Sequence, residues 1–387
     1  MSTPERLVQI LANKGSLPPA SPWAGAVAQV RREHFLPDIF EADNRTFDRS
    51  RDPKRWAWAV YADLPLVTQI NQGQDLGEDA YELPTSSSSM PTVMLQMLDL
   101  LDVHDGNTVF EAGAGTGYNA AWLCHRLGSG HVTTMDVDPG ITKQAEANLN
   151  RAGFTPRVLC GNAEDGSPDG GPYNRMIATF TVADIPYAWV EQTTESGRIV
   201  APWGGGIHHY SHAVLDVHNG RASGRFAGYP AFMRTRTQPA QGGRLRDFYH
   251  HQDEATPSRT DVSPRDISGD ADALFWIDTA VRDAWHHVGE ADDGSEEATL
   301  WLFSADHASW ATAEYVPGQT SYEVEQYGPR RLWDEAEAAY RKWVAHGRPE
   351  RDRAGLTVTR DGQHVWLDSE DNIIGTVPAT WARPEPQ

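Results

Sequence analysis

The chain has 387 residues, a formal net charge of -21, 39% hydrophobic residues and 14 Trp. The acidic balance argues against nucleic acid and anionic membrane surfaces as partners, because affinity for phosphate comes mainly from Lys and Arg. The apolar content argues against wholesale disorder, and the sequence shows neither an apolar run of about 18 residues nor a signal-peptide pattern. Cys124 and Cys160 have no metal or redox spacing, which predicts reduced thiols in a cytoplasmic protein.

The first 60 residues predict a helical and irregular lead. A helix is expected over 26–35, ending before Leu36-Pro37, and the charged stretch 47–56 is interpreted as a surface loop. Residues 61–70 indicate a short strand or a buried loop. The apolar spacing over 92–101 predicts a buried helix.

Between residues 108 and 202, predicted strands alternate with predicted helices. This order is typical of a parallel sheet covered by helices on both faces, so an α/β fold is expected. The strands are predicted at 108–110, 132–135, 157–159, 175–179 and 198–202, and the helices at 118–127, 139–152 and near 184–192.

The C-terminal part predicts a different organisation. Runs at 212–217 and 225–232 are interpreted as antiparallel edge strands, and 236–267, rich in Pro and Gly, as a linker or mobile loop. Residues 268–387 predict an accessory domain of mixed α+β type, a candidate for substrate recognition, after a main domain over 1–235. Its elements are predicted strands at 299–303 and 312–316, a helix at 331–345 and a hairpin at 356–367. Trp333, Tyr340 and Trp343 have helical spacing and are interpreted as core residues, with a peptide-binding groove as the alternative.

A glycine-rich turn follows the first predicted strand of the α/β part. Glu111 precedes glycines at alternate positions, and Asp136 ends the next strand. Such glycines allow a tight turn and close approach of the backbone to a ligand. The segment from Gly115 to Ala120 fits a dinucleotide pattern, but a carboxylate 4 Å from a pyrophosphate charge would cost about 4 kcal/mol at an effective dielectric constant near 20. S-adenosylmethionine carries an ammonium and a sulfonium instead, so the turn favours this cofactor.

The predicted cofactor-binding residues lie at the ends of three successive strands. Asn162, after the third strand, is the best candidate to meet an adenine amino group, and an ordinary polar turn is the alternative. The full set is Glu111, Gly113, Gly115, Thr116, Gly117, Tyr118, Asp136, Val137, Asn162 and Ala163.

Several blocks in one order resemble the protein-L-isoaspartate O-methyltransferase family over about residues 25–235. They are residues 32–37 and 61–66, the serine run before Met90-Pro91, the glycine turn, and 172–177. The resemblance implies a Rossmann-like S-adenosylmethionine methyltransferase fold and esterification of a peptide carboxylate, after which the ester closes to a succinimide. Two departures are visible: the family's acidic turn after the third strand is Gly161-Asn162-Ala163, and its S-x-P segment is Ser89-Met90-Pro91 after three further serines.

The serine run and the C-terminal extension resemble the longer branch that accompanies ribosomally made, modified peptides (graspetide, lanthipeptide or lasso peptide pathways). That resemblance implies methylation of an Asp side chain in a cyclised precursor, leading to aspartimide or isoaspartate. The alternative is repair of damaged isoaspartyl residues in many proteins. A scaffold without turnover is a third possibility, against which the acidic residues around the glycine turn argue.

The substrate side of the site is predicted from the serine run and from the end of the fourth strand. A carboxylate is already ionised at pH 7, so no general base is required, and Ser88 and Ser89 are candidates to orient it. A flexible polar loop is the alternative for these serines. No metal site is expected, because adjacent His pairs diverge. The predicted substrate-binding residues are Ser86, Ser87, Thr179, Phe180 and Thr181.

Overall fold

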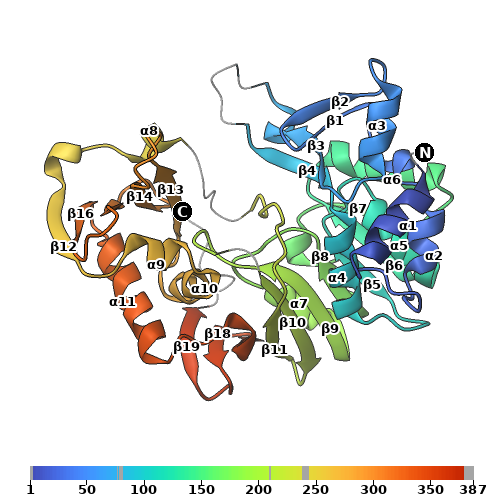
Figure 1. Cartoon of the computed structure of the whole chain (residues 1–387). Coiled ribbons are helices and arrows are strands. Elements are labelled where there is room, and N and C mark those ends of the chain that lie inside the picture. The colour runs from blue at the N-terminus through green and yellow to red at the C-terminus, as the bar shows by residue number, and fades with distance from the viewer. Residues whose placement is uncertain (1–2, 76, 78–81, 209–210, 238–243, 379–387) are drawn as a thin grey trace.

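The protein is described here from a computed structural model, which describes residues 3–75, 77, 82–208, 211–237 and 244–378. Among these residues the strands form three sheets (Figure 1). The small N-terminal sheet and the C-terminal five-stranded sheet lie on opposite sides of the molecule, joined by a ten-stranded sheet. Within the described part of the chain, no helix combines the length and the apolar character that a membrane span requires.

The N-terminal region contains helices and an antiparallel sheet in the order β2-β1-β3-β4. The predicted helix over 26–35 is wrong as one element, because Val30 has an extended backbone and separates a short α-helix from a 3-10 turn. The predicted loop over 47–56 is also wrong: Asp52 caps a helix that begins at Pro53. The elements are α1 (Pro4–Asn13), α2 (Ala24–Gln29), η1 (Arg32–Phe35), β1 (Ile39–Ala42), β2 (Arg45–Asp48), α3 (Pro53–Val60), β3 (Leu66–Ile70), η2 (Asn71–Gly73) and β4 (Pro84–Ser88).

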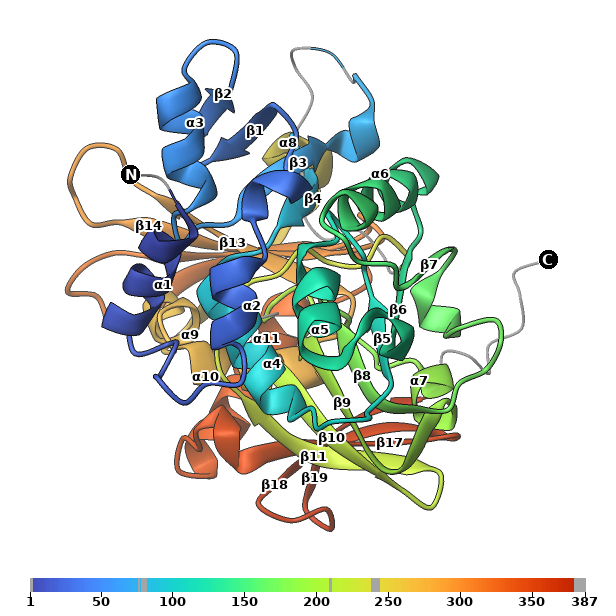
Figure 2. The same cartoon turned by 90° about the vertical axis from the view of Figure 1, so that its right-hand side faces the viewer.

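The central part confirms the predicted alternation of strands and helices. The parallel strands lie in the order β9-β8-β5-β6-β7, and β5 is buried along its whole length, as expected for a strand covered on both faces. Figure 2 shows α2, α4 and α5 over one face. The elements are α4 (Pro91–Leu101), β5 (Val109–Ala112), α5 (Tyr118–Leu127), η3 (Ser129–His131), β6 (Val132–Asp136), α6 (Pro139–Arg151), β7 (Arg157–Cys160), η4 (Ala163–Asp165), β8 (Tyr173–Ala178), α7 (Tyr187–Glu191) and β9 (Thr193–Trp203).

The same sheet continues through antiparallel strands. The strand predicted over 212–217 is present as β10 (Ser211–His218), whereas the one predicted over 225–232 is shifted, because β11 covers Arg221–Ala227. Neither is an edge strand: β10 pairs with β9 and β11, and β11 also pairs with β17 (Ala354–Thr359). β18 (Gly362–Leu367) and β19 (Ile373–Pro378) then complete the sheet. Part of the predicted accessory domain therefore shares a sheet with the α/β part, and the division of the chain into domains stays a proposal.

The rest of the C-terminal part confirms the mixed α+β expectation. Its antiparallel sheet has the order β12-β16-β15-β14-β13. The prediction of a linker or loop over 236–267 is wrong where β12 pairs with β16, and residues 238–243 lie outside the described residues. Trp333, Tyr340 and Trp343 are at most 5% exposed, which confirms them as core residues. The elements are α8 (Leu245–Phe248), η5 (Gln252–Glu254), β12 (Thr256–Thr260), α9 (Pro264–Ser268), α10 (Ala271–Ala280), β13 (Ala284–Glu290), β14 (Ala298–Ser304), β15 (Trp310–Tyr315), β16 (Tyr322–Tyr327), α11 (Leu332–Ala345) and η6 (Arg351–Arg353).

Candidate active site

The glycine turn joins the end of β5 to the start of α5. Gly113, Gly115 and Gly117 have φ angles of 94°, 51° and 87°, a region that favours glycine. A Cβ at Gly113 would lie 2.5 Å from Oγ1 of Thr179 and 2.9 Å from Cδ1 of Phe180. The amides of Gly113 and Ala114 donate to the Met135 carbonyl at 2.8 and 3.1 Å, which fixes the turn against β6.

Glu111 is fully buried beneath this turn. Its Oε1 accepts a hydrogen bond from Asn119 Nδ2 at 2.7 Å, and its Oε2 accepts one from Thr134 Oγ1 at 2.5 Å. Burial raises the pKa of Glu111 to about 7, and the neighbouring Asp136 charge acts in the same direction, although the two hydrogen bonds oppose the rise. A cationic ligand beside Glu111 would favour its ionised form.

Asp136 ends β6 next to the turn, as predicted. Its Oδ2 accepts from the Gly115 amide at 3.0 Å and its Oδ1 from the Asp138 amide at 3.1 Å. Burial raises the pKa of Asp136, and Arg236 and the two amides partly offset the rise. The Val137 side chain is 41% exposed beside this carboxylate, which leaves an apolar surface at the strand end.

The end of β7 lies beside Asp136, because the Gly161 amide donates to the Asp136 carbonyl at 2.9 Å. Asn162 uses its Oδ1 to accept from the Glu164 amide at 3.1 Å and so begins η4. The Ala163 carbonyl accepts from the Trp189 indole at 2.8 Å. The structure thus brings the predicted residues after β5, β6 and β7 to one edge of the sheet, while the adenine contact of Asn162 stays a prediction.

The side chains of Thr116 and Tyr118 are both buried. Tyr118 is 2% exposed and packs against Phe35 and Trp122 with ring centroids 5.4 and 5.1 Å away. Burial raises the pKa of the Tyr118 hydroxyl to about 12. These two residues therefore offer the site their backbone at the start of α5 more than their side chains.

The serine run forms β4 and the segment that follows it. Ser86 and Ser88 are buried, whereas Ser87 and Ser89 are half-buried, as alternation along a strand requires. A Cβ at Gly115 would lie 3.3 Å from the Ser87 carbonyl oxygen, so β4 lies directly against the glycine turn. The structure thus places the predicted substrate strand beside the predicted cofactor turn.

The Ser88 hydroxyl is held by a residue that sequence reasoning missed. Arg32 Nε donates to Ser88 Oγ at 3.1 Å, and Ser88 is only 1% exposed. This leaves Ser89 as the better placed hydroxyl for a substrate, and the catalytic roles of both serines stay predictions. Arg32 lies in one of the blocks that carried the family resemblance, but nothing local indicated its long-range partners.

The segment after β8 contacts the glycine turn, α7 and a stretch of chain near Met233 whose position the sequence did not reveal. Thr179 Oγ1 donates to the Gly113 carbonyl at 2.6 Å, and Phe180 packs edge-on against Trp189 at 6.3 Å. Thr181 is fully buried and its amide donates to the Met233 carbonyl at 2.8 Å. Thr181 therefore contributes little side-chain surface to a substrate pocket, because the chain passes over it.

We name residues 232–237 the crossing segment. Thr235 Oγ1 donates to Glu164 Oε1 at 2.5 Å, after β7. Arg236 lies 3.2 Å from Asp138 Oδ2, after β6, and donates to the Thr85 carbonyl of β4 at 2.8 Å. The crossing segment therefore connects the ends of the parallel strands to the serine strand.

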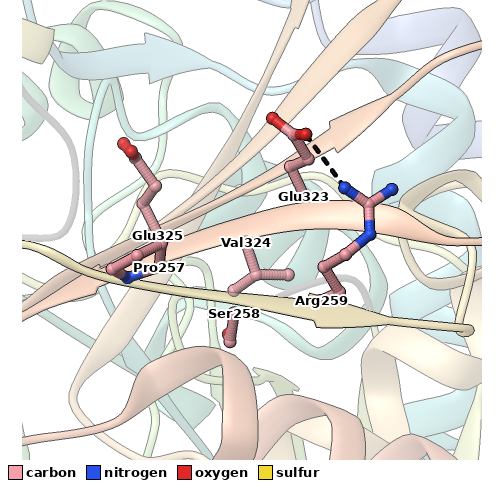
Figure 3. Close-up of a pocket in the computed structure, with 6 residues that line it drawn as sticks. All are labelled: Pro257, Ser258, Arg259, Glu323, Val324 and Glu325. Carbon is pink, nitrogen blue, oxygen red and sulfur yellow. Dashed lines mark hydrogen bonds and ion pairs between the residues drawn. The ribbon is translucent and has the colours of Figure 1, made fainter.

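A shallow cavity of ≈ 390 Å³ lies far from this edge, between β12 and β16 (Figure 3). Glu323 and Glu325 point to one side of β16 and Val324 to the other, and Arg259 pairs with Glu323 at 2.9 Å. Within the described ranges, no group of three or more His, Cys, Asp or Glu side chains is arranged to hold a metal ion.

Comparisons with known proteins agree with this geometry. The family model "Protein-L-isoaspartate(D-aspartate) O-methyltransferase (PCMT)" matches residues 2–224. A protein-L-isoaspartate O-methyltransferase of Methanococcus aeolicus is 34% identical over 45% of this chain and 74% of its own length. One of Hyperthermus butylicus is 28% identical over 57% of this chain and 83% of its own length. A solved structure of a protein-L-isoaspartate O-methyltransferase has a similar fold, with a TM-score of 0.53 and 21% identity, and it covers 95% of this chain and 100% of its own.

Proposed function

Because this chain belongs to the protein-L-isoaspartate O-methyltransferase family, we propose that it methylates the free carboxylate of isoaspartyl residues in proteins or peptides. The chain is an S-adenosylmethionine-dependent protein carboxyl O-methyltransferase with a Rossmann-like methyltransferase fold. The structural observation that supports the proposal is the serine strand, whose Ser87 carbonyl lies against the glycine turn that would hold the methyl donor.

The residues around the turn fit the cofactor. The glycines leave no Cβ between the backbone and a ligand. Two carboxylates with raised pKa values, the fully buried Glu111 and the half-buried Asp136, suit a molecule with an ammonium and a sulfonium. We propose that Asp136 accepts hydrogen bonds from ribose hydroxyls and that Val137 and Asn162 contact the adenine. Thr116, Tyr118 and Ala163 would contribute backbone atoms.

The proposed reaction needs no general base, because the acceptor carboxylate is ionised at pH 7. When bound, S-adenosylmethionine supplies an electrophilic methyl group, and the C–S electron pair leaves with the sulfur as the new C–O bond forms. The protein's own task is to hold the carboxylate in line and to exclude water, and such positioning can lower a barrier by about 7–11 kcal/mol. The Ser89 hydroxyl would orient the carboxylate without neutralising it.

The more specific substrate, an Asp side chain in a cyclised ribosomal peptide, remains a second candidate. The observation in its favour is the region beyond residue 224, which the family model does not match. However, the solved structure with the similar fold covers 95% of this chain, so the extra length has a counterpart in that protein. We therefore propose repair of isoaspartyl residues as the function.

Mass spectrometry with S-adenosylmethionine and three matched peptides tests the choice. The peptides carry L-isoaspartate, L-aspartate, or L-aspartate within a macrocycle. We expect one methyl group on the isoaspartyl peptide, followed by loss of methanol as the succinimide closes, and no change in the linear aspartyl peptide. Methylation of the macrocycle alone would overturn the repair reading in favour of peptide maturation.

A further inference from the structure

Arg32 is fully buried, and within the described part of the chain its hydrogen-bond partners include no carboxylate. The guanidinium instead donates to the Ser88 hydroxyl and to backbone carbonyls from two segments. These carbonyls belong to Val60, Ala62, Leu64, Ser88 and Ser89, at 2.9–3.2 Å. Arg32 thus fastens the end of the serine strand to the loop after α3.

The charge on this guanidinium is balanced by carbonyl dipoles and not by an ion pair. Burial lowers the pKa of Arg32 to about 10, and its charge is still present at pH 7. The nearby Asp63 is occupied elsewhere, because its Oδ2 accepts from Lys14 at 2.7 Å and its Oδ1 accepts from the Thr92 amide at 2.8 Å. The Asp63 charge acts on Arg32 through space and partly offsets the fall in its pKa, but no carboxylate among the described residues pairs with the guanidinium directly. Burial of a cation without a direct ion pair is costly in free energy, which favours a role beyond packing.

The hydrogen bonds of Arg32 also orient the backbone at Ser89. In a planar trans peptide the N–H points opposite to the C=O. Because the carbonyls of Ser88 and Ser89 point at the guanidinium, the amides of Ser89 and Met90 point away from it. Among the described residues, neither amide has a hydrogen-bond acceptor, whereas the Thr92 amide is satisfied by Asp63.

We propose that Arg32 is a positioning residue for the acceptor carboxylate. It turns the amides of Ser89 and Met90 outward, beside the Ser89 hydroxyl, so that three donors meet the substrate anion. Its buried charge, directly behind these peptide units, adds to the preference for a carboxylate over a neutral amide. This inference rests on the proposed function, because it requires an anionic acceptor at Ser89.

The test compares Arg32→Lys and Arg32→Met with the control Arg6→Met. Arg6 also donates to backbone carbonyls at the C-terminal end of α3, those of Trp58 within the helix and Tyr61 after it, and none of these hydrogen bonds reaches the serine strand. Steady-state kinetics give kcat and the KM for an isoaspartyl peptide, and calorimetry gives the Kd for S-adenosylmethionine. Competition with the same peptide carrying an α-carboxamide measures the preference for the anion.

Loss of charged hydrogen bonds predicts a rise of about 10- to 100-fold in peptide KM for both Arg32 variants. We expect the Kd for the cofactor to stay within about twofold and the affinity for the carboxamide peptide to change little. The ratio of carboxylate to carboxamide affinity should fall most in Arg32→Met, which removes the charge. Arg6→Met should match the wild type in all of these values.

If the wild type is active, an unchanged peptide KM together with an unchanged carboxylate preference in folded Arg32→Lys would overturn the inference. An inactive wild type would instead overturn the proposed function. If both Arg32 variants fail to fold, Ser88→Ala decides the matter, because it removes a single partner of the guanidinium. We expect a rise of about threefold or more in peptide KM for Ser88→Ala, with cofactor affinity unchanged, and an equal KM would again overturn the inference.

Discussion

The substitution Glu111→Gln should stabilise the free protein at alkaline pH and lower its affinity for the cofactor. Gln keeps the shape of the side chain, and Thr134 can accept a hydrogen bond where it now donates one. The rise in pKa of Glu111 from 4.5 to about 7 means that the ionised form costs the folded state about 3 kcal/mol.

The sign of the pH dependence follows from the direction of that change. A carboxyl group whose pKa is raised on folding favours the folded state below its unfolded pKa, and this contribution is lost as pH rises through about 7. Glu111→Gln should therefore have nearly wild-type stability near pH 4.5 and should exceed it by up to about 3 kcal/mol at pH 8. Urea denaturation at several pH values measures the difference, with exposed Glu146→Gln as the matched control.

Glu111→Gln should weaken cofactor binding, although it stabilises the free protein at alkaline pH. Two unit charges 4 Å apart interact with about 4 kcal/mol at an effective dielectric constant of 20, so loss of the carboxylate should weaken S-adenosylmethionine at least tenfold at pH 8. S-adenosylhomocysteine, which lacks the sulfonium charge, should lose less. The reasoning would be refuted by stability curves of wild type and Glu111→Gln that run parallel from pH 5 to pH 8, or by equal weakening of both ligands.

Three further predictions concern the turn, the crossing segment and the thiols. Gly113→Ala should cost about 1–3 kcal/mol of stability in thermal unfolding and abolish measurable cofactor binding, because φ at this position is 94° and the added Cβ would meet Thr179. Gly115→Ala should cost less stability in the same assay, because the atom nearest to its Cβ would lie 3.3 Å away. Arg236→Met should leave global stability within about 1 kcal/mol, while hydrogen exchange at residues 233–237 speeds up; unchanged exchange would contradict the anchoring role. Exposed Cys160 should react with a thiol reagent in the native protein, whereas Cys124, whose pKa burial raises to about 12, should react only on unfolding.

The sequence predicted those features that local patterns encode. The alternating strands and helices, the glycine turn and the acidic ends of β5 and β6 all appear where they were expected, because apolar periodicity and glycine spacing report them directly. Arg32 was missed as a functional residue because its partners lie 28 to 57 positions away. The crossing segment was missed for the same reason: Arg236 and Asp138 are 98 positions apart, and no short-range pattern links them.

The pairing of β11 with β17 has a consequence for shortening the chain. Residues 222–225 of β11 pair with residues 355–358, so the last part of the chain covers what would otherwise be an open border of the sheet. An uncovered border presents a row of unsatisfied N–H and C=O groups that recruits strands from other molecules. A fragment ending near residue 235 would therefore be prone to self-association even with an intact glycine turn, because its sheet would have lost the three strands that terminate it.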